Sequence, residues 1–382
     1  MLLRYRRYFA LLTFMLLATP LIVGVVRPDR PELILKEGRL LAQAPEAPLS
    51  LAALRAFPSQ ADAYLKDHFG LRQTMIHTHR DLSHPLLYGN EKVLVGRDGR
   101  MFYLGRDMVR QSAGLVLRDE KVADAADMLA EMRDALARRG ASLLVAVAPS
   151  SSTIYQDDLP LWAQKGERKT EYDLLLADLA ARGVKAVDLR PILEKARSDH
   201  NAYLMHDTHW TARSAVLAFN AIAEADGHPG WALDPDSSVG PPFERRGGDV
   251  ARIMGVEDEV TEIAQELTLP SRGKSEDLEE GPMPDHVISS GRPGPTVMVI
   301  GDSFTASYFP PMLMQHVGRA VWLNHRECGF DWSSVDKFQP DEVWWAPTER
   351  FLVCDEGVRP LNFAGRSGDD RGPVWVRGAA RD

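Results

Sequence analysis

One stretch constrains this chain more than any other: a short apolar run that ends in a glycine, an aspartate and a serine. Residues 296–300 are mostly β-branched and apolar, which is typical of a buried strand in a parallel sheet. Gly301 then allows a sharp turn, and Asp302, Ser303 and Thr305 are residue types that open helices. In α/β folds, chemistry gathers where the carboxyl end of a strand meets a helix amino terminus, whose free N–H groups can stabilise an oxyanion. Ser303 is therefore a candidate nucleophile, although Gly-Asp-Ser also forms ordinary turns.

The groups that would activate this serine occur together in a second, upstream segment. A serine hydroxyl is a weak nucleophile until a histidine removes its proton and a carboxylate holds that histidine in the useful tautomer. The segment 206–211 reads His-Asp-Thr-His-Trp-Thr. Asp207 and His209 are two residues apart, so in an extended segment both side chains leave on the same side. Thr211 is suited to cap the helix predicted to follow it. We therefore predict a catalytic triad of Ser303, His209 and Asp207.

Two other interpretations of the histidine segment remain open. In the first, Asp207 only caps a helix and His209 only packs. In the second, His206, Asp207 and His209 bind a metal ion, which would need a further ligand that the sequence does not indicate. We expect no metal and no cofactor, and the absence of a glycine-rich phosphate loop argues against nucleotide chemistry.

These two motifs resemble those of a known family. SGNH-type acyl-esterase proteins carry Gly-Asp-Ser on such a turn, and the alginate O-acetyltransferases of the AlgJ/AlgX type place Asp-x-His before the serine. Residues 301–304 and 207–211 match that branch in content and order. The similarity covers roughly residues 60–355, with weaker matches in the following segments: 66–72, 96–103, 149–160 and 349–352.

The sequence also departs from that family pattern. Ser151 or Ser152 stands where many relatives have a lysine, and Arg100 replaces a frequent tryptophan. Both changes leave the predicted triad intact but bear on substrate identity.

The resemblance implies an SGNH-hydrolase-like α/β fold and an O-acetyltransferase that transfers acetyl groups to polysaccharide hydroxyls through a serine acyl-enzyme. It also implies that a multi-spanning membrane acyltransferase supplies the acyl group. Two alternatives remain: an esterase or deacetylase that uses the same triad with water as acceptor, and a non-catalytic glycan-binding subunit.

Hydrophobic periodicity supports the same fold class. Helices are predicted at residues 121–139 and 169–182, and strands at 142–148 and 184–189. This alternation indicates right-handed crossovers and a parallel sheet flanked by helices. After Ser303 the pattern predicts a helix to about residue 317 and strands at 320–323 and 342–345. Residues 91–103 read as a hairpin with an Asp98-Gly99 turn.

Two further residues are candidates for the oxyanion or substrate site. Asn324 ends a predicted strand beyond the serine, where its amide could complete an oxyanion hole, although a plain loop asparagine fits equally well. Arg350 could orient a carboxylate or an ester oxygen, or simply pair with Glu349 at the surface. The only two cysteines, Cys328 and Cys354, could form a disulfide outside the cytoplasm or remain free buried thiols.

The amino terminus predicts a membrane anchor. Arg4, Arg6 and Arg7 precede a charge-free apolar run from Tyr8 to Val26, which as a helix would span about 28 Å, close to the thickness of a bilayer core. The arginines favour a cytoplasmic amino terminus. We therefore expect an inner-membrane protein with a single span and a periplasmic catalytic domain. A cleavable signal peptide is the alternative.

The expected organisation has four parts: an anchor (1–26), a proline-containing tether (27–50), an SGNH-like domain (51–364) and a carboxyl-terminal tail (365–382). Within the domain, residues 227–295 have weak periodicity and are rich in glycine, proline and acidic residues. They read as an insertion over the site or as a binding surface. The 382-residue chain has a net charge of −9 and no basic, aromatic-interleaved patch, which argues against nucleic acid as a partner.

Overall fold

The structure is a computed structural model that describes residues 8–9, 11–16, 18–19, 22–23, 44–45, 50–68, 89–281 and 283–354. The chain divides into two compact units, Met1–Tyr88 and Gly89–Asp382. The predicted tether lies outside the described residues except at positions 44, 45 and 50, and the predicted tail lies wholly outside them.

The first unit contains helix α3 (Leu51–His68), with Pro58 inside it. The predicted anchor is described only in short helical pieces. In the portion of the chain that the structure describes, no helix is both long and apolar enough to cross a membrane. The anchor therefore stays a prediction.

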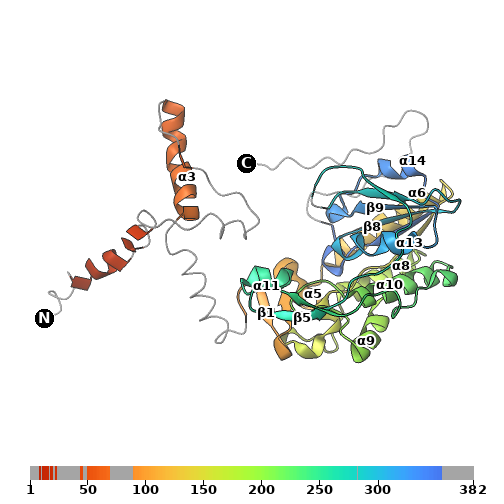
Figure 1. The fold of residues 1–382 in the computed structure, drawn as a ribbon, viewed down its shortest axis with the longest axis horizontal. Helices are drawn as coiled ribbons and strands as arrows, with labels where there is room; N and C mark the ends of the chain where they lie inside the picture. Colours follow the sequence, from red (N-terminus) through yellow and green to blue (C-terminus); the bar gives the residue numbers. More distant parts are fainter. Residues whose placement is uncertain are drawn as a thin grey trace. The chain divides into compact units, whose positions relative to one another are not determined.

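The second unit is built on a six-stranded sheet with the strand order β3-β10-β8-β9-β7-β6 (Figure 1). Its strands are β3 (Ser142–Val145), β6 (Lys274–Asp277), β7 (His286–Ser289), β8 (Thr296–Gly301), β9 (Arg319–Asn324) and β10 (Glu342–Ala346). The four strands β3, β10, β8 and β9 are parallel, as predicted. The prediction of a parallel sheet is wrong at one edge, because β7 and β6 pair antiparallel. Both come from the weakly periodic segment 227–295, and the four residues of β6 are all exposed, so no alternation marked them.

Helices cover both faces of this sheet, because alternate residues of β8 face opposite sides. Val297 and Val299 pack into one core with α9 (Arg190–Asp199), α10 (Ala212–Ala225) and α13 (Phe309–Leu313). Met298 and Ile300 pack into the other core with α6 (Asp119–Ala137) and α8 (Glu171–Ala181). Burying side chains of this size stabilises the fold by about 1.5–3 kcal/mol each. Strand β8 is therefore held from both sides, which fixes the position of its carboxyl end.

The remaining elements are short. The other helices are α5 (Met108–Ser112), α7 (Ser151–Ile154), α11 (Asp249–Met254), α12 (Ser303–Ala306) and α14 (Ser333–Phe338). Two antiparallel pairs lie outside the main sheet: β1 (Val93–Val95) with β2 (Met101–Tyr103), and β4 (Phe243–Arg246) with β5 (Thr261–Ala264). Turns of 3₁₀ helix occur at Arg97–Gly99, Gly105–Asp107, Gln156–Asp158, Leu161–Ala163, Pro229–Trp231, Arg326–Cys328 and Glu349–Phe351.

The β1–β2 pair confirms the predicted hairpin, and it packs against the segment 227–295. Val93 and Met101 of the hairpin form a small core with Val250, Ala251 and Met254 of α11, together with Val256. The segment is thus anchored to an amino-terminal part of the same unit, and Figure 1 shows α11 beside β1.

Two predicted elements differ in the structure. The strand predicted at 184–189 is only a single bridge between Ala186 and Val145, because Asp188 caps the N–H of Arg190 and α9 begins there. The long helix predicted after Ser303 is broken into α12 and α13. Pro310 and Pro311 stand at the start of α13 and have no N–H group to continue a helix from the preceding turn.

Candidate functional site

The serine lies at the start of α12, directly beyond β8. Asp302 caps this helix by accepting the N–H of Phe304 at 3.0 Å. Its other carboxylate oxygen accepts the N–H of Thr348 at 3.0 Å and also the Thr348 hydroxyl. A Cβ at Gly301 would lie 2.1 Å from Thr305 Oγ1, so only glycine fits this turn. Asp302 therefore ties the serine turn to the chain just beyond β10.

The histidine lies in a tight loop before α10. Leu204 donates its N–H to the carbonyl of His209, and Thr211 donates to that of Ala202. The Thr211 side chain caps α10 by accepting the N–H of Ser214, as predicted. The buried Trp210 donates its indole N–H to the carbonyl of Phe304 at 3.0 Å. This bond joins the histidine loop directly to the residue after the serine.

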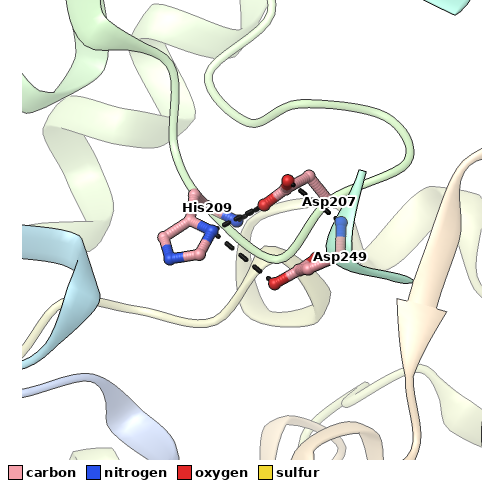
Figure 2. Close-up of side chains that lie close together, drawn as sticks. All are labelled: Asp207, His209 and Asp249. Atoms are coloured by element: carbon pink, nitrogen blue, oxygen red, sulfur yellow. Dashed lines mark hydrogen bonds and ion pairs between the residues drawn. The ribbon is translucent and has the colours of Figure 1, made fainter. Parts of the chain in front are cut away.

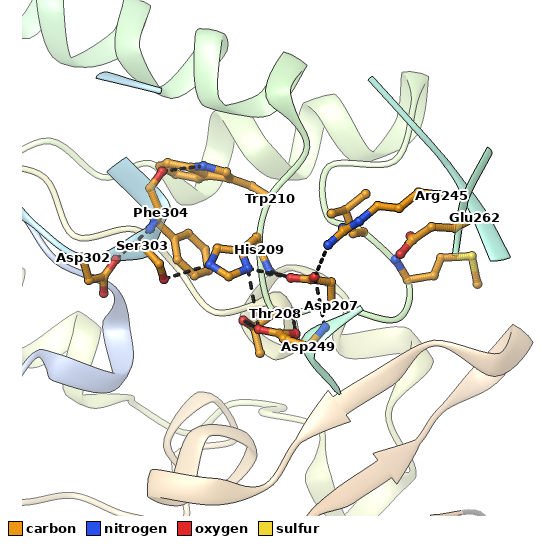
Figure 3. Close-up of polar contacts among 12 residues, drawn as sticks. Asp207, Thr208, His209, Trp210, Arg245, Asp249, Glu262, Asp302, Ser303 and Phe304 are labelled. Atoms are coloured by element: carbon orange, nitrogen blue, oxygen red, sulfur yellow. Dashed lines mark hydrogen bonds and ion pairs between the residues drawn. The ribbon is translucent and has the colours of Figure 1, made fainter. Parts of the chain in front are cut away.

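The structure brings all three predicted triad residues together (Figure 3). His209 Nε2 lies 2.8 Å from Ser303 Oγ, and His209 Nδ1 lies 2.6 Å from Asp207 Oδ1. Because the Asp207 carboxylate can only accept, Nδ1 carries the proton and Nε2 is left to accept from the serine hydroxyl. Asp207 is 3% exposed and His209 27%. The imidazole therefore has one buried anchor and one edge open to solvent.

A pocket of about 360 Å³ opens at this triad. Its walls come from the histidine loop, the start of α10, the β4–β5 pair and the residues after Ser303. The lining residues are Leu204, Asp207, His209, Thr211, Ala212, Phe243, Arg245, Ala264, Gln265, Glu266, Ser303, Ser307 and Tyr308. Residues of the segment 227–295 thus form one wall of the site.

The family described as "SGNH hydrolase-like domain, acetyltransferase AlgX" matches residues 93–354 of this chain. The chain belongs to this family. The match confirms the family predicted from the two motifs, and the family description agrees with the predicted enzyme class.

Individual relatives of this AlgX-type domain have low sequence identity to this chain. The probable alginate O-acetylase AlgJ of Pseudomonas putida is 29% identical over 138 residues, which are 36% of this chain and 34% of that protein. The chain therefore matches only about a third of the length of the curated relatives. Among solved structures, the O-acetyltransferase domain of Pseudomonas putida AlgJ has a TM-score of 0.50 at 19% identity and covers 69% of this chain and 94% of its own. Bacillus cereus PatB1 has a TM-score of 0.52 at 13% identity, covering 70% and 98%. These likenesses support the predicted SGNH-like fold.

In this AlgX-type domain, the Asp207 carboxylate is held by four donors. Oδ1 accepts the N–H of His209 at 3.0 Å as well as its Nδ1. Oδ2 accepts Arg245 Nη2 at 2.7 Å and the N–H of Asp249 at 3.1 Å. Burial alone would raise the pKa of Asp207, but the bonds from His209 and the charge of Arg245 hold it well below its usual value. Asp207 therefore stays ionised and keeps His209 in one tautomer.

Arg245, Asp249 and Glu262 reach this site without having been predicted. All three come from the segment 227–295, and Glu262 accepts the N–H of Met205 at 2.5 Å at the start of the histidine loop. Each is a charged residue in a weakly periodic stretch, so neither spacing nor motif marked it. The one local signal is the pair Gly247-Gly248, whose positive φ values mark a turn forced close to another chain segment.

Both oxyanion or substrate candidates lie near the serine turn: Asn324 ends β9 opposite Gly301 of β8, and Arg350 lies near the ring of Phe304. Its guanidinium is 5.6 Å from the ring centre of Phe304, and no carboxylate among the described residues pairs with it. The alternative of a surface pair with Glu349 is wrong, because Glu349 is fully buried and bonds to Ser150 and Thr153. Asn324 instead donates its side-chain amide to Met283 and is not among the described residues that line the pocket.

The metal alternative with His206 does not match the structure. In the described part of the chain, the potential ligand atoms that come within 4.8 Å of one another here belong to Asp207, His209 and Asp249 (Figure 2). His206 Nδ1 lies instead 4.0 Å from Glu262 Oε1. His206 is thus a neighbour of the triad and not a member of this group.

Finally, Cys328 and Cys354 form a disulfide, which decides between the two possibilities left by the sequence. The bond links the turn after β9 to the chain beyond β10. Thr348 and Arg350 therefore lie within the covalent loop that the disulfide closes.

Proposed function

We propose that this chain is a serine-dependent O-acetyltransferase that transfers acetyl groups to hydroxyls of an extracytoplasmic polysaccharide. The observation that carries the proposal is the unbroken hydrogen-bond chain from Asp207 through His209 to Ser303, which opens into a pocket. The family description as an acetyltransferase and the name of the Pseudomonas putida relative, a probable alginate O-acetylase, support the acyl group and the acceptor class.

The geometry supports a two-step transfer. In the first step His209 Nε2 takes the proton of Ser303 while Oγ attacks the carbonyl carbon of the donor ester, and His209 returns that proton to the departing donor oxygen. An acetyl group is then bound to Ser303 Oγ. In the second step a sugar hydroxyl attacks the acetyl carbon, His209 takes the hydroxyl proton, and Ser303 leaves and regains a proton. No redox agent is needed.

The backbone N–H of Ser303 is the candidate donor to the oxyanion. It stands at the first position of α12, where no intrahelical acceptor is available, and it has no acceptor elsewhere in the described part of the chain. Arg350 is a candidate second contact for the donor or the acceptor, because its guanidinium faces Phe304 beside this N–H group.

The pocket wall suits a hydroxyl-rich acceptor. Arg245, Gln265 and Glu266 supply donors and acceptors, and Phe243 and Tyr308 supply aromatic surface. Transfer to a glycan needs this acceptor to compete with water for the acetyl-enzyme. If water wins, the same triad is an esterase or deacetylase.

We further propose that the protein is held in the inner membrane by a single amino-terminal span, with the catalytic domain in the periplasm and a multi-spanning membrane acyltransferase as acyl supplier. The three arginines before the apolar run and the disulfide between Cys328 and Cys354 support this placement. Fractionation should recover the chain with membranes. A soluble product that begins after Ala44 would refute the anchor.

The test of the activity uses the full-length chain and its Ser303→Ala variant. A serine-directed phosphonate should label the wild type, and labelling should vanish in Ser303→Ala, which lacks the only atom proposed to carry the acetyl group. With an activated acetyl ester and candidate glycans, acetylated glycan indicates a transferase, free acetate alone an esterase, and neither product a binding subunit. Substantial turnover by folded Ser303→Ala would refute the serine mechanism.

A further inference from the structure

A second carboxylate lies against the triad histidine. Asp249, the first residue of α11, places its Oδ2 3.6 Å from His209 Nδ1, the nitrogen that bonds to Asp207 (Figure 2). Its backbone N–H also donates to Asp207 Oδ2. The His209 ring edge therefore faces two carboxylates, one at hydrogen-bond distance and one just beyond it.

Asp249 is also bonded to the residue between the two triad members. Its Oδ1 accepts the N–H of Thr208 at 2.6 Å and its Oδ2 accepts the Thr208 hydroxyl at 2.5 Å. Because the Asp249 carboxylate accepts hydrogen bonds from both donors of Thr208, it fixes the loop from Asp207 to His209. The fixed loop in turn sets the orientation of the His209 imidazole.

The position of Asp249 is set by close packing of its own segment. Gly248 has a φ of +158°, and a Cβ there would lie 2.1 Å from the carbonyl oxygen of His206. That same oxygen accepts the N–H of Ala251 at 3.1 Å, and α11 is buried against the β1–β2 hairpin. The contact between Asp249 and the histidine loop is therefore part of the packed structure.

We infer that Asp249 is a second positioning residue for His209, which orients the histidine loop through Thr208 and can replace Asp207 as the partner of Nδ1. The inference rests on the proposed function, because it assigns a role within the same triad. When His209 takes the serine proton, the positive charge develops between the two carboxylates and both favour it.

The two carboxylates are not equivalent. Asp207 has four donors and a cationic neighbour, whereas burial and the charge of Asp207 raise the pKa of Asp249. Asp207 is thus the ionised partner of His209 Nδ1, and Asp249 is the carboxylate that can take its place. Asp249 needs only a small movement to do so. Its Oδ2 lies 3.6 Å from His209 Nδ1 and must approach to about 2.8 Å to accept a charge-assisted hydrogen bond.

The first experiment is Asp249→Asn in the full-length chain, compared with Glu244→Gln as control. Asparagine keeps one oxygen for the Thr208 N–H and can donate to the Thr208 hydroxyl, so the loop stays held while the charge is lost. Glu244 lies exposed on β4, in the same segment 227–295 as Asp249, and is not among the described residues that line the pocket. Phosphonate labelling of Ser303 should slow roughly 10-fold in Asp249→Asn, less than the 10²–10⁴-fold typical of a direct proton-transfer group, and stay unchanged in Glu244→Gln.

The pH dependence separates positioning from a purely structural role. With one anion beside His209 removed, the acid limb of the labelling-rate profile should move to lower pH in Asp249→Asn. An unchanged limb would overturn the inference.

The second experiment is a cycle with Asp207→Ala. This change frees space beside Nδ1, and Asp249 should take the place of the lost carboxylate. Asp249→Asn should therefore cost at least 10-fold more in the Asp207→Ala background than in the wild type. Equal costs in the two backgrounds would show that Asp249 does not act through His209.

Failure of this inference and failure of the proposed function give different results. If wild-type Ser303 is not labelled, the proposed function fails. The far-downfield proton resonance of His209 Nδ1–H, retained in Asp207→Ala and lost in the double variant, would still show the bond to Asp249. If labelling is instead abolished by a chelator and restored by zinc, Asp207, His209 and Asp249 form a metal site and the inference is wrong.

Discussion

The sharpest prediction concerns Asp207→Asn, because the structure dictates how the new amide can sit. The carboxylate of Asp207 accepts from four donors, two on each oxygen. An asparagine has one accepting oxygen and one donating NH₂ group. One side of the residue must therefore lose both of its bonds.

The two orientations of the amide have different consequences. If the oxygen faces His209, the tautomer needed for catalysis is kept, but the NH₂ group points at Arg245 Nη2 and the N–H of Asp249, which are both donors. If the NH₂ group faces His209, only the backbone N–H of His209 is opposed, and the bonds to Arg245 and Asp249 are kept. Nδ1 must then accept, the proton moves to Nε2, and Nε2 can no longer take the proton of Ser303. An opposed buried donor costs about 1–3 kcal/mol. The first orientation opposes a backbone N–H and the partly exposed Arg245, whereas the second opposes a single backbone N–H, so the second, inactive orientation is favoured.

We therefore expect Asp207→Asn to fold but to lose on the order of 10⁴ in turnover, the loss caused by the same change in the serine protease triad. The same reasoning predicts a partial rescue. Arg245→Met removes one of the two donors that oppose the productive orientation, so Asp207→Asn/Arg245→Met should be more active than Asp207→Asn alone. The assay is the rate of phosphonate labelling, with thermal unfolding as the check on folding. Activity of Asp207→Asn within 10-fold of wild type, or no gain in the double variant, would refute this account of the site.

Two other predictions concern residues near the serine turn. Burial lowers the pKa of His325 to about 4, so the unfolded chain takes up a proton near pH 6.5 that the folded chain resists. The contribution of His325 to stability should therefore be constant above pH 6.5 and fall by about 3 kcal/mol between pH 6.5 and 4. Urea unfolding across this range should show a flatter profile for His325→Phe, and equal slopes would contradict the prediction. Arg350→Met should raise KM for the donor or acceptor with little change in stability, because Arg350 is itself partly exposed where it contacts the rings of Phe304 and Phe351. Unchanged kinetics would remove Arg350 from the substrate site.

Local patterns predicted the parts of the fold that bury continuous apolar runs. Strand β8 and its parallel neighbours were predictable because residues on both faces of the sheet are buried, such as Val299 on one face and Ile300 on the other. The edge strand β6 and its neighbour β7 were not, because the side chains of β6 are all exposed and β7 is a short strand whose pairing is set by contact with β9. The bridge at Ala186 likewise shows that an apolar run becomes a strand only where a neighbour continues beside it.

The residue types of the triad could be predicted, but the residues that hold them could not. Gly301, Asp302 and the Asp-x-His spacing are local features of short motifs. Arg100 shows the opposite case: its buried guanidinium donates to the carbonyl of Leu204 at 3.1 Å and bonds to Asp158. Hydrogen bonds of this kind depend on which distant segment of the chain lies against the histidine loop, and no local sequence pattern encodes that contact.

The geometry of the site thus comes from contacts that link each motif to a different part of the chain. Trp210 follows the histidine and bonds to the carbonyl of Phe304, which follows the serine, so the two motifs are joined twice across 94 residues of sequence. On the serine side, Asp302 binds Thr348 beyond β10. On the histidine side, Asp207 binds Arg245 and Asp249 of the segment 227–295. Because the serine turn and the histidine loop are each held by a different segment, a change in either segment can misalign the triad without touching any of its three residues. Substitutions of Arg245 or Asp249 should therefore act on turnover through His209, which distinguishes these two residues from the exposed residues of the segment 227–295.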